Sequence, residues 1–387
     1  MGSVRKRKEH GTWEARWYGI DGKQHSRNFK TKGDATRHVQ GMEGDKVRGD
    51  YMDPKLARTP FSVVADSWYA TTAQRKEKTR AGYRSILDYH LLPAFGAMGI
   101  ARIDAGMIDL HIAGMTVAPA TRLNVLHVLG SVMNHAVKRR MIPRNPVAEA
   151  DRPKVARPNA DAMPFLTAEQ AQELADEVGP RHRTLVLFAV YTGMRAGEIA
   201  GLRVRNLDLM RATARVEEAV SDVNGHLILG GPKTDSSIRT VTLPRFLVDM
   251  LMEQVAGKGQ DEFVFGGEQP LRYGNWYART FRPAVARLVA RGDWPEKPMA
   301  TLRFHDLRHT AAALMIANGE HPKAVQERLG HSSIAITMDR YGKLYPNAAE
   351  ALAERLDATY QEATSSDLSR EVRSTVDGVV GAEVGSG

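Results

Sequence analysis

The stretch RFHDLRHTAAALMIANG, from Arg303 to Gly319, carries the pattern on which the expected fold and chemistry of this chain depend. His305 and His309 are four residues apart, so a helix would place them on one face, with Arg308 between them. An apolar set recurs at helical spacing on another side: Leu307, Ala311, Leu314 and Met315, continued by Asn318. The stretch therefore predicts a helix whose two histidines and arginine point away from the core.

Two histidines at this spacing could hold a metal ion. Arg308 argues against it, because a fixed positive charge repels a divalent cation and attracts an anion such as phosphate. A metal-dependent nuclease that uses His305 and His309 remains an alternative, although arginines stand where further metal ligands would be needed. We expect no metal and no cofactor.

Composition favours a polyanionic partner. The chain has 387 residues, which suggests two or three domains, and a formal net charge of +9. Lysines and arginines gain affinity for phosphates by releasing counterions, so nucleic acid is the expected partner, with a basic enzyme that does not bind nucleic acid as the alternative. The chain has no cysteine, which excludes disulfides, thiolate zinc sites and a cysteine nucleophile.

No segment predicts secretion or membrane insertion. The first residues, MGSVRKRKEHGTW, are charged but lack the apolar region of a signal peptide. The longest apolar run, Leu185–Tyr191, has the length of a buried helix and not of a membrane span. We expect a cytoplasmic protein, associated with the nucleoid of a bacterial host, and no membrane partner.

The first 52 residues predict a small three-stranded sheet with one helix. TWEARWYGI and KQHSRNFKT flank Asp21-Gly22, a strong hairpin signal, and a helix over about 33–47 would cover one face. Basic and aromatic residues alternate along both arms. That pattern suits a sheet laid on DNA, and equally a solvated sheet face.

Residues 60–150 predict an all-helical domain, and a proline-bearing basic linker, DRPKVARP, follows it. One basic cluster stands at a helix start, where positive charge costs stability unless an anion is bound, and another stands at a helix end, where it also complements the helix dipole. The residues expected to contact DNA, in this domain and in the sheet module, are Arg5, Lys6, Arg7, Arg16, Arg27, Lys30, Arg75, Lys76, Lys78, Arg80, Lys138, Arg139 and Arg140.

Residues 160–363 predict a mostly helical domain with a small antiparallel sheet, and 364–387 a flexible tail. Thr167 is the expected N-cap of a helix, with Gln170 completing a capping box. Two or three short strands are expected, in the segments 214–220, 226–231 and 237–244. The whole chain is thus a multidomain α+β protein.

Four segments of this last domain hold polar residues that periodicity leaves unexplained. Arg195 opens a helix after Thr192-Gly193, where it could bind phosphate or pair with Glu198. Lys233 stands just before a turn, Thr234–Ser237, that is expected to join two strands as a hairpin. His331 follows a Leu-Gly helix stop, and Tyr341 lies beyond a short helix. Each residue alone has an ordinary structural role.

Taken together, the series Arg195, Lys233, His305, Arg308, His331 and Tyr341 resembles the catalytic set of the tyrosine recombinases of phage integrase type. The motifs that carry the resemblance are TGMRAGE, HDLRH and LGHSS followed by TMDRY. The resemblance extends to the amino-terminal part, where residues 1–52 look like an arm-type DNA-binding domain and 60–150 like a core-binding domain. One departure is small: the family often has Val-Pro-Leu where this chain has Val241-Thr242-Leu243.

The resemblance implies a site-specific recombinase that cleaves and rejoins double-stranded DNA through a covalent 3'-phosphotyrosyl link, without metal or ATP. Tyr341 would attack the phosphodiester, Arg195 and Arg308 would clamp its oxygens, and Lys233 would protonate the leaving oxygen. His305 and His331 would bond the phosphate and assist transfer of the tyrosine proton. Glu198 and Asp306 would orient these groups.

The resemblance also implies a homotetramer on core and arm attachment sites, with a host DNA-bending protein and an excision factor as further partners. The segment PNAAEALAERLDATYQEA could dock on a neighbouring subunit or pack on its own domain.

Three further alternatives stay open. A type IB topoisomerase uses similar chemistry, and a catalytically silent DNA-binding regulator could share the fold. Tyr345 is a rival nucleophile four residues after Tyr341, although its spacing from His331 departs from the family pattern.

Overall fold

The computed structural model of the chain describes residues 2–7, 11–20, 22–48, 51–155, 163–231, 238–345, 353–354, 356–361 and 364. The chain divides into two compact units, Met1–Arg157 and Pro158–Gly387. Lys233 and nearly all of the predicted tail lie outside the described residues, as does much of the segment expected to dock on a neighbour.

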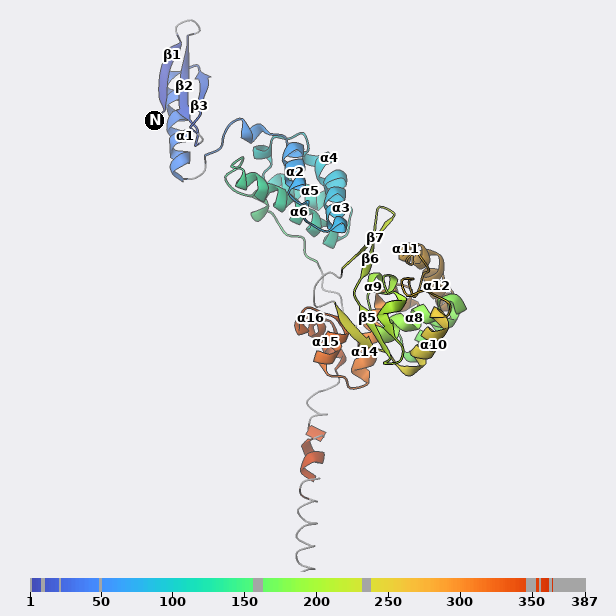
Figure 1. Ribbon diagram of the computed structural model, residues 1–387. Coiled ribbons are helices and arrows are strands. Elements are labelled where there is room, and N and C mark those ends of the chain that lie inside the picture. Colours follow the sequence, from blue (N-terminus) through green and yellow to red (C-terminus); the bar gives the residue numbers. More distant parts are fainter. Residues whose placement is uncertain are drawn as a thin grey trace, which may run out of the picture. The chain divides into compact units, whose positions relative to one another are not determined.

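The first unit begins with a three-stranded antiparallel sheet, β1 (Ser3–Arg7), β2 (Thr12–Tyr18) and β3 (Gln24–Phe29), in the order β1-β2-β3. Helix α1 (Lys32–Arg48) lies along it (Figure 1). Ala15 of β2 packs with Ala35 and Val39 of α1 in a small core. The predicted hairpin and covering helix are confirmed.

The strand register separates the basic residues of this module. Residues opposite each other in a sheet share a face. Arg27 pairs with Ala15, whose side chain packs against α1, and the Arg27 guanidinium lies 5.4 Å from the Phe29 ring. Arg16 pairs with Ser3 and Ser26 on the opposite, open face. Arg16 and Arg27 therefore lie on opposite faces of the sheet.

A helical region follows, as predicted. Its elements are α2 (Phe61–Ala70), α3 (Glu77–Ile86), a π-helical segment (Leu87–Leu91) that continues into α4 (Leu92–Phe95), α5 (Ala105–Gly114) and α6 (Pro119–Lys138). Phe61 of α2 and Leu129 of α6 are fully buried in a continuous apolar core. Lys76 is the N-cap of α3, and Arg139 the C-cap of α6, so both basic clusters stand at helix ends.

The second unit is built around helix α8 (Pro180–Thr192), which is apolar on nearly every side and buried. The other helices are α7 (Ala168–Glu177), α9 (Ala196–Ala200), α10 (Arg245–Val255), α11 (Tyr273–Trp276), α12 (Arg282–Ala290), α13 (Glu296–Met299), α14 (Asp306–Ala317), α15 (Pro322–Leu329) and α16 (Ile334–Tyr341). The predicted capping box of Thr167 and Gln170 is present at the start of α7.

Short 3₁₀ or π segments connect these elements: Leu56–Arg58, Ile100–Arg102, Pro146–Ala148, Val204–Asn206, Tyr277–Phe281 and Gly342–Leu344.

Two small antiparallel sheets accompany the helices of this unit. One has the order β4-β5-β8, from β4 (Leu207–Asp208), β5 (Thr213–Val216) and β8 (Arg239–Thr242). The other is the hairpin of β6 (Ala219–Val223) and β7 (His226–Gly230). Asn224 and Gly225 make its turn, both with positive φ.

The sheets correct two expectations. The predicted strand over 214–220 is two strands that belong to different sheets. Strands β7 and β8, which Lys233 was expected to join as a hairpin, pair with β6 and β5 instead. The Asn224-Gly225 turn joins β7 to β6, and β8 belongs to the other sheet.

Candidate active site

Helix α14 places Arg308 in the interior of the second unit. The Arg308 side chain is 4% exposed, and its guanidinium reaches two turns of the chain. Nη1 donates to the carbonyl oxygen of Gly193 at 2.6 Å, and Nη2 donates to that of Leu329, also at 2.6 Å. Carbonyl oxygens are the partners that allow an arginine to be buried without a carboxylate.

These two turns depend on glycines in the left-handed conformation. Gly193 ends α8 with φ of 65°, and Gly330 ends α15 with φ of 66°. A side chain at Gly193 would place its Cβ 2.6 Å from Cδ2 of Leu329. The turn after α8 and the turn after α15 therefore pack closely, with Arg308 bonded to both.

The carboxylate of Glu198 binds two further arginines next to these turns. Arg195, the N-cap of α9, donates from Nη1 to Oε1 of Glu198 at 2.7 Å and from Nη2 to the carbonyl oxygen of Gly330 at 3.2 Å. Arg239 of β8 donates from Nη2 to Oε2 of Glu198 at 2.9 Å. The side chain of Glu198 is 3% exposed. Of the two alternatives for Arg195, the pairing with Glu198 is thus observed. The side chain of Arg195 keeps 38% of its surface exposed.

Glu198 and Arg308 keep their ordinary charges at neutral pH. Burial acts to raise the pKa of Glu198, but the charge and hydrogen bond of Arg239 and the contacts of Arg195 outweigh it and lower the pKa. Burial, reinforced by the charge of Arg195, lowers the pKa of Arg308 to about 9. Arg308 therefore stays protonated, and the site combines three guanidinium groups with one carboxylate.

His331 follows the Gly330 turn and is 6% exposed. Its Nδ1 lies 2.8 Å from the hydroxyl oxygen of Thr337 on α16. Burial and the nearby charges of Arg308 and Arg195 lower the pKa of His331 to about 3, so the ring is neutral at physiological pH.

Tyr341 is the last residue of α16 and is fully buried. Its ring lies almost parallel to that of His331, with centroids 6.4 Å apart. Its hydroxyl oxygen lies 2.6 Å from Nδ1 of His309. Burial raises the pKa of Tyr341, opposed by the charges of Arg308 and Arg340. The sequence predicted this tyrosine beyond a short helix, whereas the structure includes it in that helix.

The expectation that the polar residues of α14 face away from the core was wrong for two of three. His309 and Arg308 are both 4% exposed, because the turns after α8 and α15 and helix α16 cover that side of the helix. Only His305 reaches the surface. The loss of surrounding water and the charge of Arg308 still lower the pKa of His305.

The structure thus brings together five of the six predicted residues: Arg195, His305, Arg308, His331 and Tyr341. The sequence interpretation undervalued His309, whose contact with Tyr341 joins residues 32 positions apart. It also gave Arg239 no role at the site. The only local signal for Arg239 was its place in the strand after Lys233.

The rival tyrosine lies elsewhere. The hydroxyl of Tyr345 is 3.5 Å from the carbonyl oxygen of Glu320, and none of its described contacts is to an arginine of the cluster. Burial and the charge of Glu320 raise its pKa.

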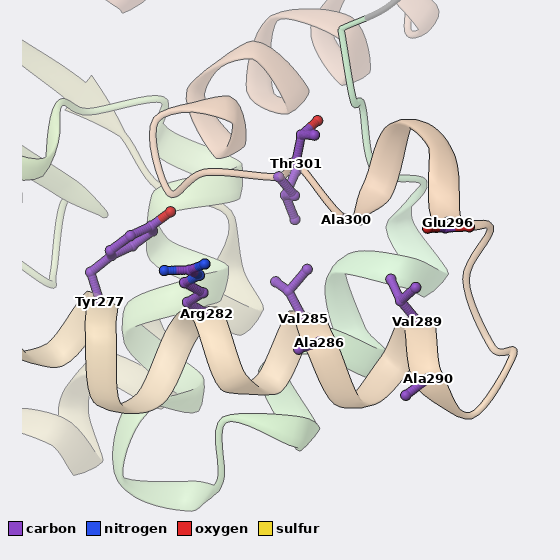
Figure 2. Close-up of a pocket in the computed structure, with 10 residues that line it drawn as sticks. Tyr277, Arg282, Val285, Ala286, Val289, Ala290, Glu296, Ala300 and Thr301 are labelled. Atoms are coloured by element: carbon purple, nitrogen blue, oxygen red, sulfur yellow. The ribbon is translucent and has the colours of Figure 1, made fainter.

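Two other features bear on function. Within the described residues, no three His, Asp or Glu side chains gather as metal ligands do, and no helix is long and apolar enough to cross a bilayer. A cavity of about 630 Å³ lies outside the cluster, with Tyr277, Arg282, Val285 and Thr301 in its lining (Figure 2). Arg195, His305, Arg308, His331 and Tyr341 are not part of its lining.

Comparison with known proteins agrees with this geometry. The phage integrase family model matches residues 164–348, and the phage integrase central domain matches 61–152. These matches span more than half of the chain, which therefore belongs to the phage integrase family of tyrosine recombinases and is a site-specific DNA recombinase.

Among its relatives, the prophage phiRv2 integrase of Mycobacterium tuberculosis is 26% identical over 344 residues, which is 84% of this chain and 86% of that protein. The Tn1549 transposon integrase, solved in complex with transposon right end DNA, has a TM-score of 0.64 at 19% identity and covers 77% of this chain and all (100%) of that one. A lambda integrase tetramer bound to a Holliday junction has a TM-score of 0.52 at 18% identity, over 85% of this chain and 95% of that one. The two solved structures support the fold.

Proposed function

We propose that Tyr341 is the nucleophile of this recombinase and that Arg195, Arg308, His305, His331 and Lys233 complete its active site. One observation carries the proposal. Arg308 is hydrogen-bonded to the turn before Arg195 and to the turn before His331, and the ring of His331 lies parallel to that of Tyr341. Three chain segments far apart in sequence, 193–195, 305–308 and 329–341, supply the groups that meet here. Residues brought together only by packing are more specific evidence than any one motif.

The cluster suits the transition state of phosphoryl transfer. As an oxygen attacks phosphorus, negative charge on the non-bridging oxygens is stabilised by fixed donors that need no rearrangement. Arg308 is held by two carbonyl oxygens and Arg195 by Glu198, so both guanidinium groups are oriented before DNA arrives. A cluster of three arginines attracts a phosphate and repels a divalent cation, so cleavage proceeds in the presence of EDTA.

Lys233 is the proposed acid for the leaving 5' oxygen. His305, which reaches the surface, and His331, neutral at physiological pH, are the proposed hydrogen-bonding partners of the scissile phosphate. The covalent product is a 3'-phosphotyrosyl link, which conserves the energy of the phosphodiester bond for rejoining.

The test is a nicked duplex that traps covalent protein–DNA adduct. Tyr341→Phe should bind this DNA as tightly as the unaltered protein and form no adduct. Tyr345→Phe is the matched control and should form adduct normally. Adduct that persists in Tyr341→Phe and disappears in Tyr345→Phe would move the nucleophile to Tyr345. Adduct formation that requires a divalent ion would contradict the metal-free scheme.

Residues 1–52 are proposed to bind arm sites, 60–150 to bind the core site, and 160–363 to perform the chemistry. The open face of the N-terminal sheet supports the first assignment, because Arg5 and Arg16 lie on it around the central Glu14, with Nε of each bonded to Oε2. Arg7 lies on the same face. Removing residues 1–50 should leave core-site cleavage intact and weaken integration at long attachment sites. Equal integration by the shortened protein would contradict the arm-binding assignment.

A homotetramer on DNA is proposed by analogy with the lambda integrase tetramer on its Holliday junction. A host bending protein and an excision factor are proposed partners of the same assembly, which would act on DNA in the bacterial nucleoid.

A further inference from the structure

In the hydrogen bond between Tyr341 and His309, the donor and the acceptor can be assigned. The tyrosine hydroxyl is fully buried, and His309 Nδ1, at 2.6 Å, is its hydrogen-bond partner among the described residues. A phenolic hydroxyl has one hydrogen to donate, and a buried donor left without an acceptor costs about 1–3 kcal/mol. The hydroxyl therefore donates to Nδ1, and the neutral His309 ring carries its own hydrogen on Nε2.

The other two histidines of the site are less well placed to take this hydrogen. Nδ1 of His331 is bonded to the Thr337 hydroxyl at 2.8 Å, and its ring lies parallel to the tyrosine ring at 6.4 Å. His305 packs edge-on against His309, with ring centroids 5.2 Å apart. Of these three histidines, His309 is the one that makes a hydrogen bond with the phenolic oxygen.

His309 is also held in place by its helix. It follows Arg308, whose guanidinium is anchored to two turns of the chain, and precedes Thr310, whose hydroxyl accepts the backbone N–H of Leu166 at 3.2 Å. A proton acceptor on a helix that also carries the phosphate-binding arginine keeps a fixed relation to that arginine.

We propose that His309 is a catalytic residue that accepts the phenolic proton of Tyr341 during DNA cleavage. The inference rests on the proposed role of Tyr341. As the bond from Oη to phosphorus forms, the O–H bond breaks and its proton moves to Nδ1 of His309. The bond from phosphorus to the 5' oxygen breaks, and that oxygen takes a proton from the proposed acid Lys233. Rejoining reverses each step, so His309 returns the proton to the tyrosine.

The neutral state of His309 supports this role. Burial, with the charge of His305 adding to it, lowers the pKa of His309 to about 4, so at physiological pH the ring is neutral and Nδ1 keeps a free lone pair for the phenolic hydrogen. The arginines that flank the site would stabilise the phenolate as it forms, since Arg308 and Arg340 both act to lower the pKa of Tyr341.

The decisive experiment compares His309→Ala with His309→Asn on the nicked duplex. Removing a general base lowers a rate by about 10²–10⁴-fold. The asparagine oxygen can accept the tyrosine hydrogen bond and hold the ring, but it cannot take the proton. We expect both variants to be slow, DNA binding to be unchanged, and added imidazole to restore part of the rate in His309→Ala only. Recovery of the full rate in His309→Asn would overturn the proposal and leave a positioning role.

A second substrate separates the base from the acid. In a 5'-bridging phosphorothiolate the leaving group is a thiolate, which departs without being protonated. Lys233→Ala should recover on this substrate, whereas His309→Ala should remain slow. Recovery of His309→Ala would mean that His309 serves the leaving group and would refute the proposal.

Two controls keep the outcomes apart. His321→Asn changes an exposed histidine at the N-cap of α15 to another good cap and should cleave within about twofold of the unaltered protein. If Tyr341→Phe still forms adduct, the proposed nucleophile fails. If Tyr341→Phe forms none while His309→Ala cleaves normally, the nucleophile stands and the proposal for His309 is refuted.

Discussion

The guanidinium of Arg308 and the carbonyl oxygen of Gly193 lie 2.6 Å apart, although 115 residues separate them in the chain. The same guanidinium bonds the carbonyl of Leu329, so one buried cation joins the turn before α9 to the turn after α15. Each turn carries another candidate residue, Arg195 or His331. Arg308 therefore fixes the geometry of the site and also contributes to the positive charge of the site.

Arg308→Lys should slow cleavage by about 10²–10³-fold, the usual effect of losing one fixed transition-state donor. A single ammonium cannot reproduce the planar fork that reaches both carbonyls and still faces a phosphate. The measurement is the rate of adduct formation at saturating DNA. Arg328→Lys is the matched control, because Arg328 also bridges two carbonyls, of Tyr191 and Thr242, each at 2.9 Å. It should lower stability without slowing the folded enzyme, and equal slowing of both variants would point to a general packing effect.

Glu198→Gln should lower the free energy of unfolding by about 2–4 kcal/mol, since it leaves Arg195 and Arg239 without their shared buried carboxylate. Denaturant titration measures the change. Asp261→Asn removes a carboxylate that pairs with Arg205 on the surface and should cost less than about 1 kcal/mol. Similar losses in the two variants would show that the buried carboxylate has no special weight.

Gly193→Ala should cost about 2–4 kcal/mol, from the left-handed backbone and from the close approach of the new Cβ to Leu329 and to Ala311 at 3.1 Å. Gly225 has φ of 82° and open space where a Cβ would lie, so Gly225→Ala should cost only about 1 kcal/mol. Thermal unfolding of the two variants separates backbone strain from the steric clash. A loss in Gly193→Ala no larger than that in Gly225→Ala would exclude the clash.

The second unit should lose stability as the pH is lowered, at pH values above those at which carboxylates titrate. The pKa of His309 is lowered to about 4 and that of His331 to about 3, whereas an unfolded histidine titrates near 6.5. Between these values the unfolded chain binds protons that the native chain does not, so stability falls as pH decreases from 7 to 5. Each histidine contributes about 2 kcal/mol to this fall. His331→Asn should therefore reduce the loss of stability over that interval in denaturant titrations, and an unchanged slope would contradict the burial of a neutral ring.

Much of the chain could be predicted from local patterns. The hairpin of β2 and β3, the capping box of Thr167, the helix stop at Gly330 and the helical region after residue 60 all follow from side chains within a few positions of each other. Such signals act over one helical turn or one hairpin, which is the range over which a sequence can be interpreted without knowing the packing. The order of the motif residues also predicted the family, because those residue types rarely occur together at these separations.

Only the tertiary structure decided which groups meet. Strand register placed Arg27 on the helix-covered face, and β8 paired with β5. His309 reached Tyr341 because the last residue of α16 packs beside α14. The bond between Arg195 and Gly330 joins residues 135 positions apart. The sequence by itself determined the helices, the basic clusters and the chemical types at the site. The partner of each buried polar group was set by packing, because its hydrogen bond must be satisfied by whatever segment the folded core brings next to it.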